Sequence, residues 1–398
     1  MTKRKKKTPF SGYRYYAVLF LICILFLAVP SAVRLVRFYV FDPQINEAFT
    51  ADAGDERETD LIGNFFLKQG FLNANGFVRR LLFQREMNGV VRLKNDYLTD
   101  LNPELDAAVL AGEADAVAHV QSVLKEYDIP FLYVMTPVKL DEASELAAAQ
   151  GGASLLPAGE TTYANRNMDR FLSELSARGV ETMDLREEIR QAGMDSYEVF
   201  YRTDHHWTTE GALFAAGRIA GWVRSAAGEP DITLHTDPSE YHFKIYPGWH
   251  LGSNGQRTGR GFAGADDFTL ITPAFDTDLT NLVSGERGRM EEVLLCPEAI
   301  AEKDLSKSSY DLVYTHALEQ YHNNAADNDV RILLICDSFG AALNPYLVLS
   351  FADTECMSAY APGLLTRAYL EEKKPDAVIL MQYPGLNLGI DSSYAFGL

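Results

Sequence analysis

The chain has 398 residues and a formal net charge of −19, with 47% hydrophobic and 23% charged residues. This composition excludes a disordered, collagen-like or coiled-coil protein and allows a large buried core. The length fits two or three domains at most, or one large domain with an insertion. An acidic chain repels phosphate backbones, which argues against nucleic acid as a partner.

The N-terminal region has the opposite charge to the rest. Six basic residues fall within residues 1–14, and residues 15–33 carry no charge. About 20 such residues span the hydrocarbon layer of a bilayer. We therefore predict a cytoplasmic tail at 1–14 and a single-pass transmembrane anchor at 15–36, with everything after it outside the cell. A cleaved signal peptide is the alternative, although the apolar run is long for one.

The four cysteines do not form a disulfide framework. One of them, Cys23, lies in the apolar run, which leaves Cys296, Cys336 and Cys356 outside it, with no metal-ligand spacing among them. At most one bridge can form, and buried unpaired thiols are the favoured interpretation.

The rest of the chain is predicted to be an acidic stalk at 37–75 and an α/β domain at 76–398. Helices are predicted, in chain order, over 102–127, 161–178, 186–192, 208–225, 344–351 and 365–373. Strands are predicted over 129–135, 180–185, 197–202, 331–336, 354–359 and 376–382. Alternating strands and helices indicate a mainly parallel, three-layer α/β sheet. Residues 227–330 break this rhythm and are interpreted as an irregular insertion or lid.

One candidate catalytic segment leads from a predicted strand into a helix. It contains Asp204, His205 and His206. In extended chain, residues two apart share a side, so Asp204 and His206 are expected together, with His205 pointing the other way. A carboxylate beside an imidazole suits a general base that takes a proton from a hydroxyl. The alternative is that Asp204 caps the helix and the histidines only pack.

A second candidate segment follows the apolar strand 331–336. Asp337 and Ser338 stand where this strand turns into a helix, so the serine is presented at a strand's carboxyl end with backbone N–H groups nearby. The alternative is an ordinary turn. Parallel topology brings both segments to one sheet edge, where a serine, a histidine and an aspartate would converge.

The string Asp204-His205-His206-Trp207 with the later Asp337-Ser338-Phe339 resembles the DHHW proteins, relatives of the alginate O-acetyltransferases with an SGNH-hydrolase-like fold. The resemblance extends from about Phe77 to the C-terminus and includes residues 135–139 and Gly252-Ser253. It implies that Ser338 is the nucleophile, His206 the base and Asp204 the carboxylate that orients it. The position before Asp337 is usually Gly in that group and is Cys336 here. Asp337 is expected to shape the turn.

Several further residues are candidates for binding sugar hydroxyls or the acyl oxygen, and each also has a structural interpretation. They are Arg202, Asn254, Arg257, Gln382 and Tyr383. Tyr246, Trp249 and His250 are a candidate platform for stacking a sugar ring. The sequence has no Gly-rich phosphate loop and no zinc-type histidine spacing beyond the adjacent pair, so no cofactor or metal is expected.

The function predicted from these observations is a membrane-anchored extracytoplasmic O-acyltransferase. It would acetylate hydroxyls of a cell-surface polysaccharide through an acetyl-serine intermediate. The resemblance implies a multi-pass membrane acyltransferase as the partner that supplies acetyl groups. A carbohydrate esterase with the same triad is one alternative. Others are a catalytically silent polysaccharide-binding or assembly protein and a structural protein whose motif is fortuitous.

Overall fold

The computed structural model describes residues 68–297, 305 and 308–398, and, nearer the N-terminus, residues 16–22, 24–26, 28–30 and 33. The chain divides into two units, Met1–Asn75 and Gly76–Leu398. The predicted tail at 1–14 and most of the predicted stalk lie outside the described residues. The described residues of the predicted anchor are helical. Within the described part of the chain, no helix has the length and apolar character needed to cross a membrane.

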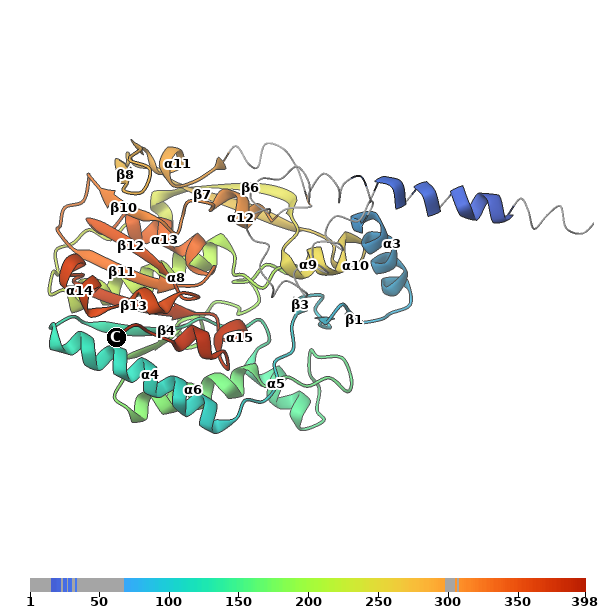
Figure 1. Cartoon of the computed structure of the whole chain (residues 1–398), viewed down its shortest axis with the longest axis horizontal. Helices are drawn as coiled ribbons and strands as arrows, with labels where there is room; N and C mark the ends of the chain where they lie inside the picture. Colours follow the sequence, from blue (N-terminus) through green and yellow to red (C-terminus); the bar gives the residue numbers. More distant parts are fainter. Residues whose placement is uncertain are drawn as a thin grey trace, which may run out of the picture. The chain divides into compact units, whose positions relative to one another are not determined.

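An eight-stranded sheet forms the centre of the second unit (Figure 1), in the order β5-β4-β13-β11-β12-β10-β8-β9. The strands from β5 to β12 in this order are parallel, and β10, β8 and β9 are antiparallel additions. The mainly parallel sheet predicted from the sequence is confirmed. The bounds are β4 (Phe131–Met135), β5 (Thr182–Asp184), β8 (Leu279–Asn281), β9 (Arg287–Gly288), β10 (Gln320–Asn323), β11 (Arg331–Cys336), β12 (Asp353–Ser358) and β13 (Ala377–Gln382).

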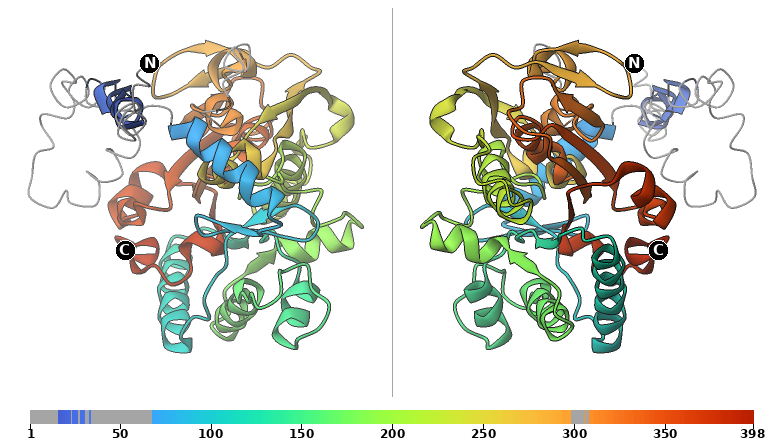
Figure 2. Two further views of the ribbon diagram at one scale, coloured as in Figure 1. Left: turned by 90° about the vertical axis from the view of Figure 1, so that its right-hand side faces the viewer. Right: turned by 90° about the vertical axis from the view of Figure 1, so that its left-hand side faces the viewer.

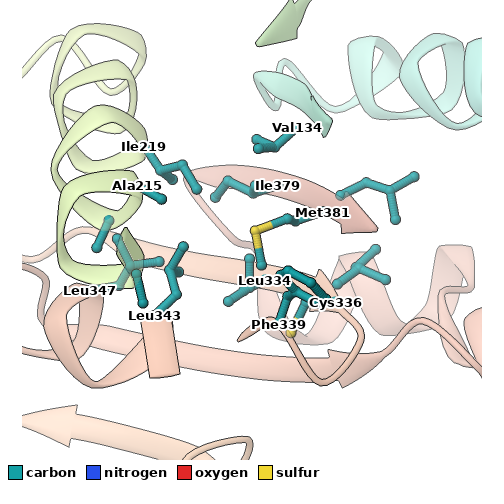
Figure 3. Close-up of a cluster of buried hydrophobic side chains, with 14 of the residues drawn as sticks. Val134, Ala215, Ile219, Leu334, Cys336, Phe339, Leu343, Leu347, Ile379 and Met381 are labelled. Carbon is teal, nitrogen blue, oxygen red and sulfur yellow. The ribbon is translucent and has the colours of Figure 1, made fainter. Parts of the chain in front are cut away.

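Helices cover both faces of this sheet, as Figure 2 shows. On one face α4 (Ala107–Glu126) packs with α6 (Ala164–Ala177), and on the other α8 (Thr209–Ala226) packs with α13 (Gly340–Val348). Every residue of β4 and β13 is buried, because strands covered on both faces have no polar side. Figure 3 shows Leu334 and Ile379 of the sheet beside Ala215 and Ile219 of α8. Three further helices lie between the strands of the parallel part of the sheet or beside them, namely α5 (Glu142–Ala149), α7 (Leu185–Gln191) and α14 (Arg367–Lys373).

The stretch at 227–330 is more regular than the sequence indicated. It forms a long two-stranded ribbon and also supplies the three antiparallel strands of the central sheet. The turn-rich sequence concealed these strands because most of them are only two to four residues long. Its elements outside the central sheet are β6 (Tyr241–His250), β7 (Asp266–Pro273), α9 (Ser253–Thr258), α10 (Arg260–Ala263), α11 (Met290–Val293) and α12 (Ser309–Val313).

A small three-stranded sheet precedes the main fold in the chain. Its strands are β1 (Glu86–Met87), β2 (Val90–Arg92) and β3 (Leu98–Thr99), and they follow α3 (Lys68–Leu81). A short helix, α15 (Pro384–Asn387), comes directly after β13. The backbone N–H of Leu98 donates to the carbonyl of Arg202 at 2.9 Å, which ties β3 to the loop before α8.

Two predicted helix starts were wrong. The helix α4 begins at Ala107, where Asp106 accepts a hydrogen bond from the Ala108 N–H, rather than at residue 102. The helix α13 begins at Gly340 rather than at residue 344, so Pro345 lies inside the helix and not in its first turn. Proline usually marks a helix start because it lacks an N–H, but here the turn after β11 passes directly into the helix.

Candidate active site

Ser338 stands in the turn between β11 and α13, two residues after the strand ends. Its side chain is partly exposed, and its Oγ lies 2.7 Å from Nε2 of His206. The two residues are 132 positions apart in the sequence and meet at the carboxyl edge of the sheet. A hydroxyl that donates to an imidazole nitrogen is the arrangement from which a general base can take a proton.

His206 is oriented by Asp204 within the loop that leads into α8. Nδ1 of the imidazole lies 3.2 Å from Oδ1 of the carboxylate. A carboxylate only accepts hydrogen bonds, so Nδ1 carries the proton and Nε2 presents its lone pair to Ser338. Thr208 ends the loop and caps α8 by accepting from the Gly211 N–H at 3.1 Å. The ring of His206 stacks on Tyr310 with centroids 4.3 Å apart.

The Asp204 carboxylate is buried and receives several donors besides His206. Its Oδ1 accepts from the N–H of His205 at 2.8 Å and the hydroxyl of Ser253 at 2.9 Å. Its Oδ2 accepts from Nε2 of His250 at 3.0 Å. Burial alone raises the pKa of this carboxyl, but the charge of His206 and the hydrogen bonds outweigh it and hold the pKa well below its usual value. Asp204 therefore stays ionised.

Gly252 makes this crowding possible. A Cβ at residue 252 would overlap the Asp204 side chain, so only glycine lets the chain pass so close. The next residue, Ser253, begins α9 and makes the hydrogen bond to the carboxylate. These contacts give a physical reason for the Gly252-Ser253 pair that the sequence comparison had noted.

The predicted direction of His205 was wrong. Its ring lies beside that of His206, with centroids 3.9 Å apart, and its Nδ1 is 2.6 Å from Oγ of Ser253. The alternation of sides holds only in extended strands, and residues 202–206 form a bend. Since Ser253 donates its proton to Asp204, its oxygen accepts from Nδ1 of His205. The other ring nitrogen of His205 is then the acceptor.

His250 also has a different place from the one predicted. It is fully buried and bonded to Asp204, so it cannot stack on a sugar. Its ring packs on Tyr201 at a centroid distance of 4.3 Å. No local pattern indicates this contact, because His250 is 46 residues from Asp204 and lies at the end of β6.

Asp337, next to the nucleophile, binds backbone and amide donors. Its carboxylate accepts from the N–H of Phe339 at 3.0 Å and of Tyr383 at 2.5 Å, and from Nδ2 of Asn387 at 2.7 Å. Burial raises the pKa of this carboxyl despite these hydrogen bonds. These contacts tie the turn after β11 to the end of β13, as expected of a residue that shapes the turn.

Comparison with known proteins finds a resemblance to one family over part of the chain and a shared fold over most of it. Residues 95–243 match the family model for the SGNH hydrolase-like domain of the acetyltransferase AlgX. The chain is 29% identical over 170 residues to the probable alginate O-acetylase AlgJ of Pseudomonas fluorescens, an alignment that covers 40% of this chain. This part of the chain is therefore similar to the SGNH hydrolase-like domains of alginate O-acetylation proteins. The chain covers only 41% of the length of this AlgJ relative.

Two solved structures share the fold of this SGNH hydrolase-like domain. Bacillus cereus PatB1 with a sulfonyl adduct superposes with a TM-score of 0.59 at 20% identity, over 79% of this chain and 99% of that chain. A DHHW family protein from Eubacterium siraeum superposes with a TM-score of 0.55 at 16% identity, over 78% of this chain and 95% of that chain. The resemblance to DHHW proteins drawn from the sequence is confirmed.

A buried lysine of the SGNH hydrolase-like domain supports the loop that carries the histidines. The Nζ of Lys139 donates to the carbonyls of Leu98 at 2.6 Å, Arg202 at 3.4 Å and Asp204. Burial lowers the pKa of this amine to about 8, although nearby carboxylates oppose the shift. The sequence marked residues 135–139 only as part of the resemblance and gave Lys139 no role.

The predicted substrate-binding residues take different places. Arg202 donates to the carbonyl of Ala265 at 2.9 Å, and Arg257 pairs with Asp100 at 2.6 Å. Asn254 is buried and donates to the carbonyl of Leu98 at 3.2 Å. The side chains of these three residues thus hold neighbouring loops together.

Gln382 and Tyr383, at the end of β13, have different surroundings. Gln382 is fully buried and donates to the carbonyl of Ser393 at 3.1 Å. The ring of Tyr383 stacks on Phe339 with centroids 4.5 Å apart and lies 5.8 Å from the ring of His205. Among the five predicted binding residues, Tyr383 therefore has a ring contact with His205, in the loop that carries the histidines.

Within the described residues, Asp204, His205 and His206 bring their ligand atoms close enough to hold a metal ion. The same atoms already take part in hydrogen bonds to Ser253 and to each other, and His206 presents Nε2 to Ser338. A hydroxyl, an imidazole and a carboxylate that are hydrogen-bonded in this order suit nucleophilic acyl chemistry.

Proposed function

We propose that this domain is an O-acyltransferase that acetylates hydroxyls of a cell-surface polysaccharide through an acetyl-Ser338 intermediate. The observation that carries the proposal is the 2.7 Å hydrogen bond between Oγ of Ser338 and Nε2 of His206, with Asp204 on the other side of the imidazole. The name of the AlgJ relative, a probable alginate O-acetylase, supports a polysaccharide hydroxyl as the acceptor.

In the first half-reaction Oγ of Ser338 attacks the carbonyl carbon of an acetyl donor while His206 takes the hydroxyl proton. The bond from the carbonyl to the leaving group breaks, and His206 returns the proton to that group. In the second half-reaction a sugar hydroxyl attacks the acetyl-serine, His206 takes its proton, and Ser338 leaves and is reprotonated. The ionised Asp204 stabilises the imidazolium that forms in both steps.

The tetrahedral intermediates need donors for their oxyanion. The turn after β11 has few free backbone donors. The N–H of Phe339 donates to Oδ1 of Asp337, and the N–H of Gly340 donates to the carbonyl of Asp337, both at 3.0 Å. Among the hydrogen bonds of the described residues, none uses the backbone N–H of Ser338. We assign the Ser338 N–H as one oxyanion donor on this basis.

The proposed location is the outer face of the cell membrane. The support is the sequence of residues 1–36, in which six basic residues precede the uncharged run at 15–33. Acetyl groups are not free outside the cell, so the proposal includes a multi-pass membrane acyltransferase as the donor partner. An anchored enzyme would stay beside that donor.

Intact-mass spectrometry of the full chain in detergent, after incubation with an activated acetyl ester, tests the mechanism. We expect one time-dependent acetyl adduct, absent from Ser338→Ala and slowed in His206→Ala. The matched control is Ser358→Ala, an exposed serine at the end of β12 in register with Cys336, and it should still gain the adduct. No adduct on the folded parent would overturn the covalent mechanism and favour a binding or assembly role.

A second measurement separates the transferase from an esterase, which uses the same triad. The acetylated enzyme is mixed with water alone or with an oligosaccharide of mannuronate, and release of acetate is compared with formation of acetylated sugar. A transferase forms the sugar ester faster than acetate. If acetate is the sole product at every sugar concentration, the domain is an esterase.

A further inference from the structure

The end of α3 exposes an unusual set of large apolar side chains. Those of Phe77, Val78, Leu81, Leu82 and Phe83 are 56%, 51%, 60%, 63% and 87% exposed. Single exposed apolar residues are common on soluble proteins, but a contiguous patch of them marks an interaction surface. We call residues 77–83 the apolar tip.

The backbone of the apolar tip is in an unfavourable conformation at its most exposed residue, Phe83. Phe83 has a φ of 56°, in the left-handed region that bulky residues avoid. Its N–H donates to the carbonyl of Arg80 at 3.1 Å, and the N–H of Gln84 donates to that of Arg79 at 3.0 Å. This pair of hydrogen bonds ends a helix at a position where glycine is the usual residue. A phenylalanine held there, in solvent, indicates that the ring itself is used.

The charge around the apolar tip is opposite to that of the whole chain. Residues 76–96 contain five basic and two acidic residues, whereas the formal net charge of the protein is −19. Arg80 lies within the tip and is exposed. Apolar and aromatic side chains interleaved with arginines are typical of segments that enter the interface of an anionic membrane.

We propose that the apolar tip docks on an anionic lipid surface. The rings and aliphatic chains of Leu81, Leu82 and Phe83 would enter the boundary between headgroups and acyl chains, and Arg80 would bind lipid phosphates. Residues 37–75 connect this surface in the sequence to the proposed anchor, so a tethered domain would meet the membrane at high effective concentration.

The apolar tip is joined to the candidate active site through α9 and α10. Gly76 packs so closely on this pair that a Cβ there would lie 2.8 Å from Cβ of Phe262 and from the carbonyl oxygen of Thr258. The first residue of α9 is Ser253, which binds Asp204. Docking would therefore orient the edge that carries Ser338 toward the membrane. The docking does not depend on acyl transfer, but its use in receiving acetyl groups rests on the proposed function.

Tryptophan fluorescence of the full chain in vesicles tests the docking. Phe83→Trp is reconstituted in vesicles of phosphatidylcholine and phosphatidylglycerol (3:1), with or without bromine on the acyl chains. The emission of the parent protein, which has three tryptophans, is subtracted. We expect bromine to reduce the added emission about twofold, because the ring lies at acyl-chain depth.

The matched control is Val283→Trp, which changes a 66% exposed residue just after β8. The strand β8 lies at the opposite end of the unit from β1 (Figure 1). Bromine should leave its emission unchanged. Leu82→Trp repeats the test if Phe83→Trp does not fold. Arg80→Glu in the Phe83→Trp background should lose most of the quenching, as should vesicles without phosphatidylglycerol.

Quenching of Phe83→Trp no greater than that of Val283→Trp would overturn the docking. So would burial of the tryptophan in detergent that increases with protein concentration, because a micelle buries the ring at any protein concentration whereas a second copy of the chain does so only when copies associate. Addition of Ser338→Ala should leave the quenching unchanged. The docking and the acyl-transfer mechanism can therefore fail separately.

Discussion

His250 donates a hydrogen bond from Nε2 to Oδ2 of Asp204 at 3.0 Å, opposite the oxygen that faces His206. The carboxylate thus joins two imidazoles, one beside Ser338 and one fully buried. Both histidines donate to it, and both hydrogen bonds favour the ionised carboxylate. We interpret His250 as a positioning residue that acts on the nucleophile through Asp204 and His206.

The variant His250→Phe removes one donor and keeps an aromatic ring in the buried space. Without that donor the pKa of Asp204 rises, and the carboxylate is held less firmly against Nδ1 of His206. We expect acylation of Ser338 near pH 7 to slow about tenfold, the worth of one hydrogen bond to a charge. The readout is the rate of acetyl-adduct formation across pH 4 to 8.

The matched control for His250→Phe is His316→Phe, which changes a half-exposed histidine that pairs with Glu319. Its profile should overlay that of the parent. If His250→Phe acylates Ser338 at the parent's rate, the hydrogen bond to Oδ2 does not position the triad.

The close packing of Gly340 against Cys336 leads to a second prediction, on stability. A Cβ at residue 340 would overlap Sγ of Cys336 and lie 3.3 Å from Leu318. Gly340→Ala should therefore lower the free energy of unfolding by about 1–3 kcal/mol through overpacking. Cys336→Ala removes the sulfur, so the double variant should lose less than the sum of the two single losses, with a coupling of about 1 kcal/mol. Urea unfolding of all four proteins measures this, and strictly additive losses would contradict it.

The sequence predicted the central sheet well because its signal is local. The runs that became β4, β11 and β13 are continuously apolar, and strands buried on both faces require that pattern. Ser338 was predicted at the carboxyl end of the strand that became β11, and the structure places it there. The strand predicted over 197–202 was wrong, because those residues form turns and a bend with one isolated bridge, so Asp204 and His206 reach the same edge from a loop.

The residues that support this site gave no such signal. His250, Ser253 and Lys139 reach Asp204 from 46, 49 and 65 residues away, and nothing in their local sequence indicates the contact. His205 was misplaced because a rule for strands was applied to a bend. The short strands of residues 227–330 were missed because a two-residue or three-residue pairing has no detectable period.

The carboxylates on either side of the nucleophile predict different defects. Asp204→Asn places a neutral amide beside His206 and allows the wrong tautomer, so acylation of Ser338 should fall by about 10³-fold or more with the fold retained. Asp337→Asn puts an NH₂ group among donors from Phe339, Tyr383 and Asn387. It should lower the unfolding temperature and leave acylation per folded molecule within about threefold. Reversed defects would mean that Asp337 orients the base.

Lys139→Met should reveal the buried amine through the pH dependence of stability. Because the pKa of Lys139 is lowered to about 8, the folded state binds fewer protons than the unfolded state between about pH 8 and 10.5, and this residue adds stability as the pH rises. Methionine keeps the apolar stem but leaves the carbonyl of Asp204 without this donor and the carbonyl of Leu98 with Asn254 alone, which should cost about 2 kcal/mol. The difference in unfolding free energy from the parent should widen by about 2 kcal/mol from pH 8 to 10. Urea unfolding at pH 7 to 10 measures it, with exposed Lys94→Met as the control, and a difference that stays constant with pH would contradict the prediction.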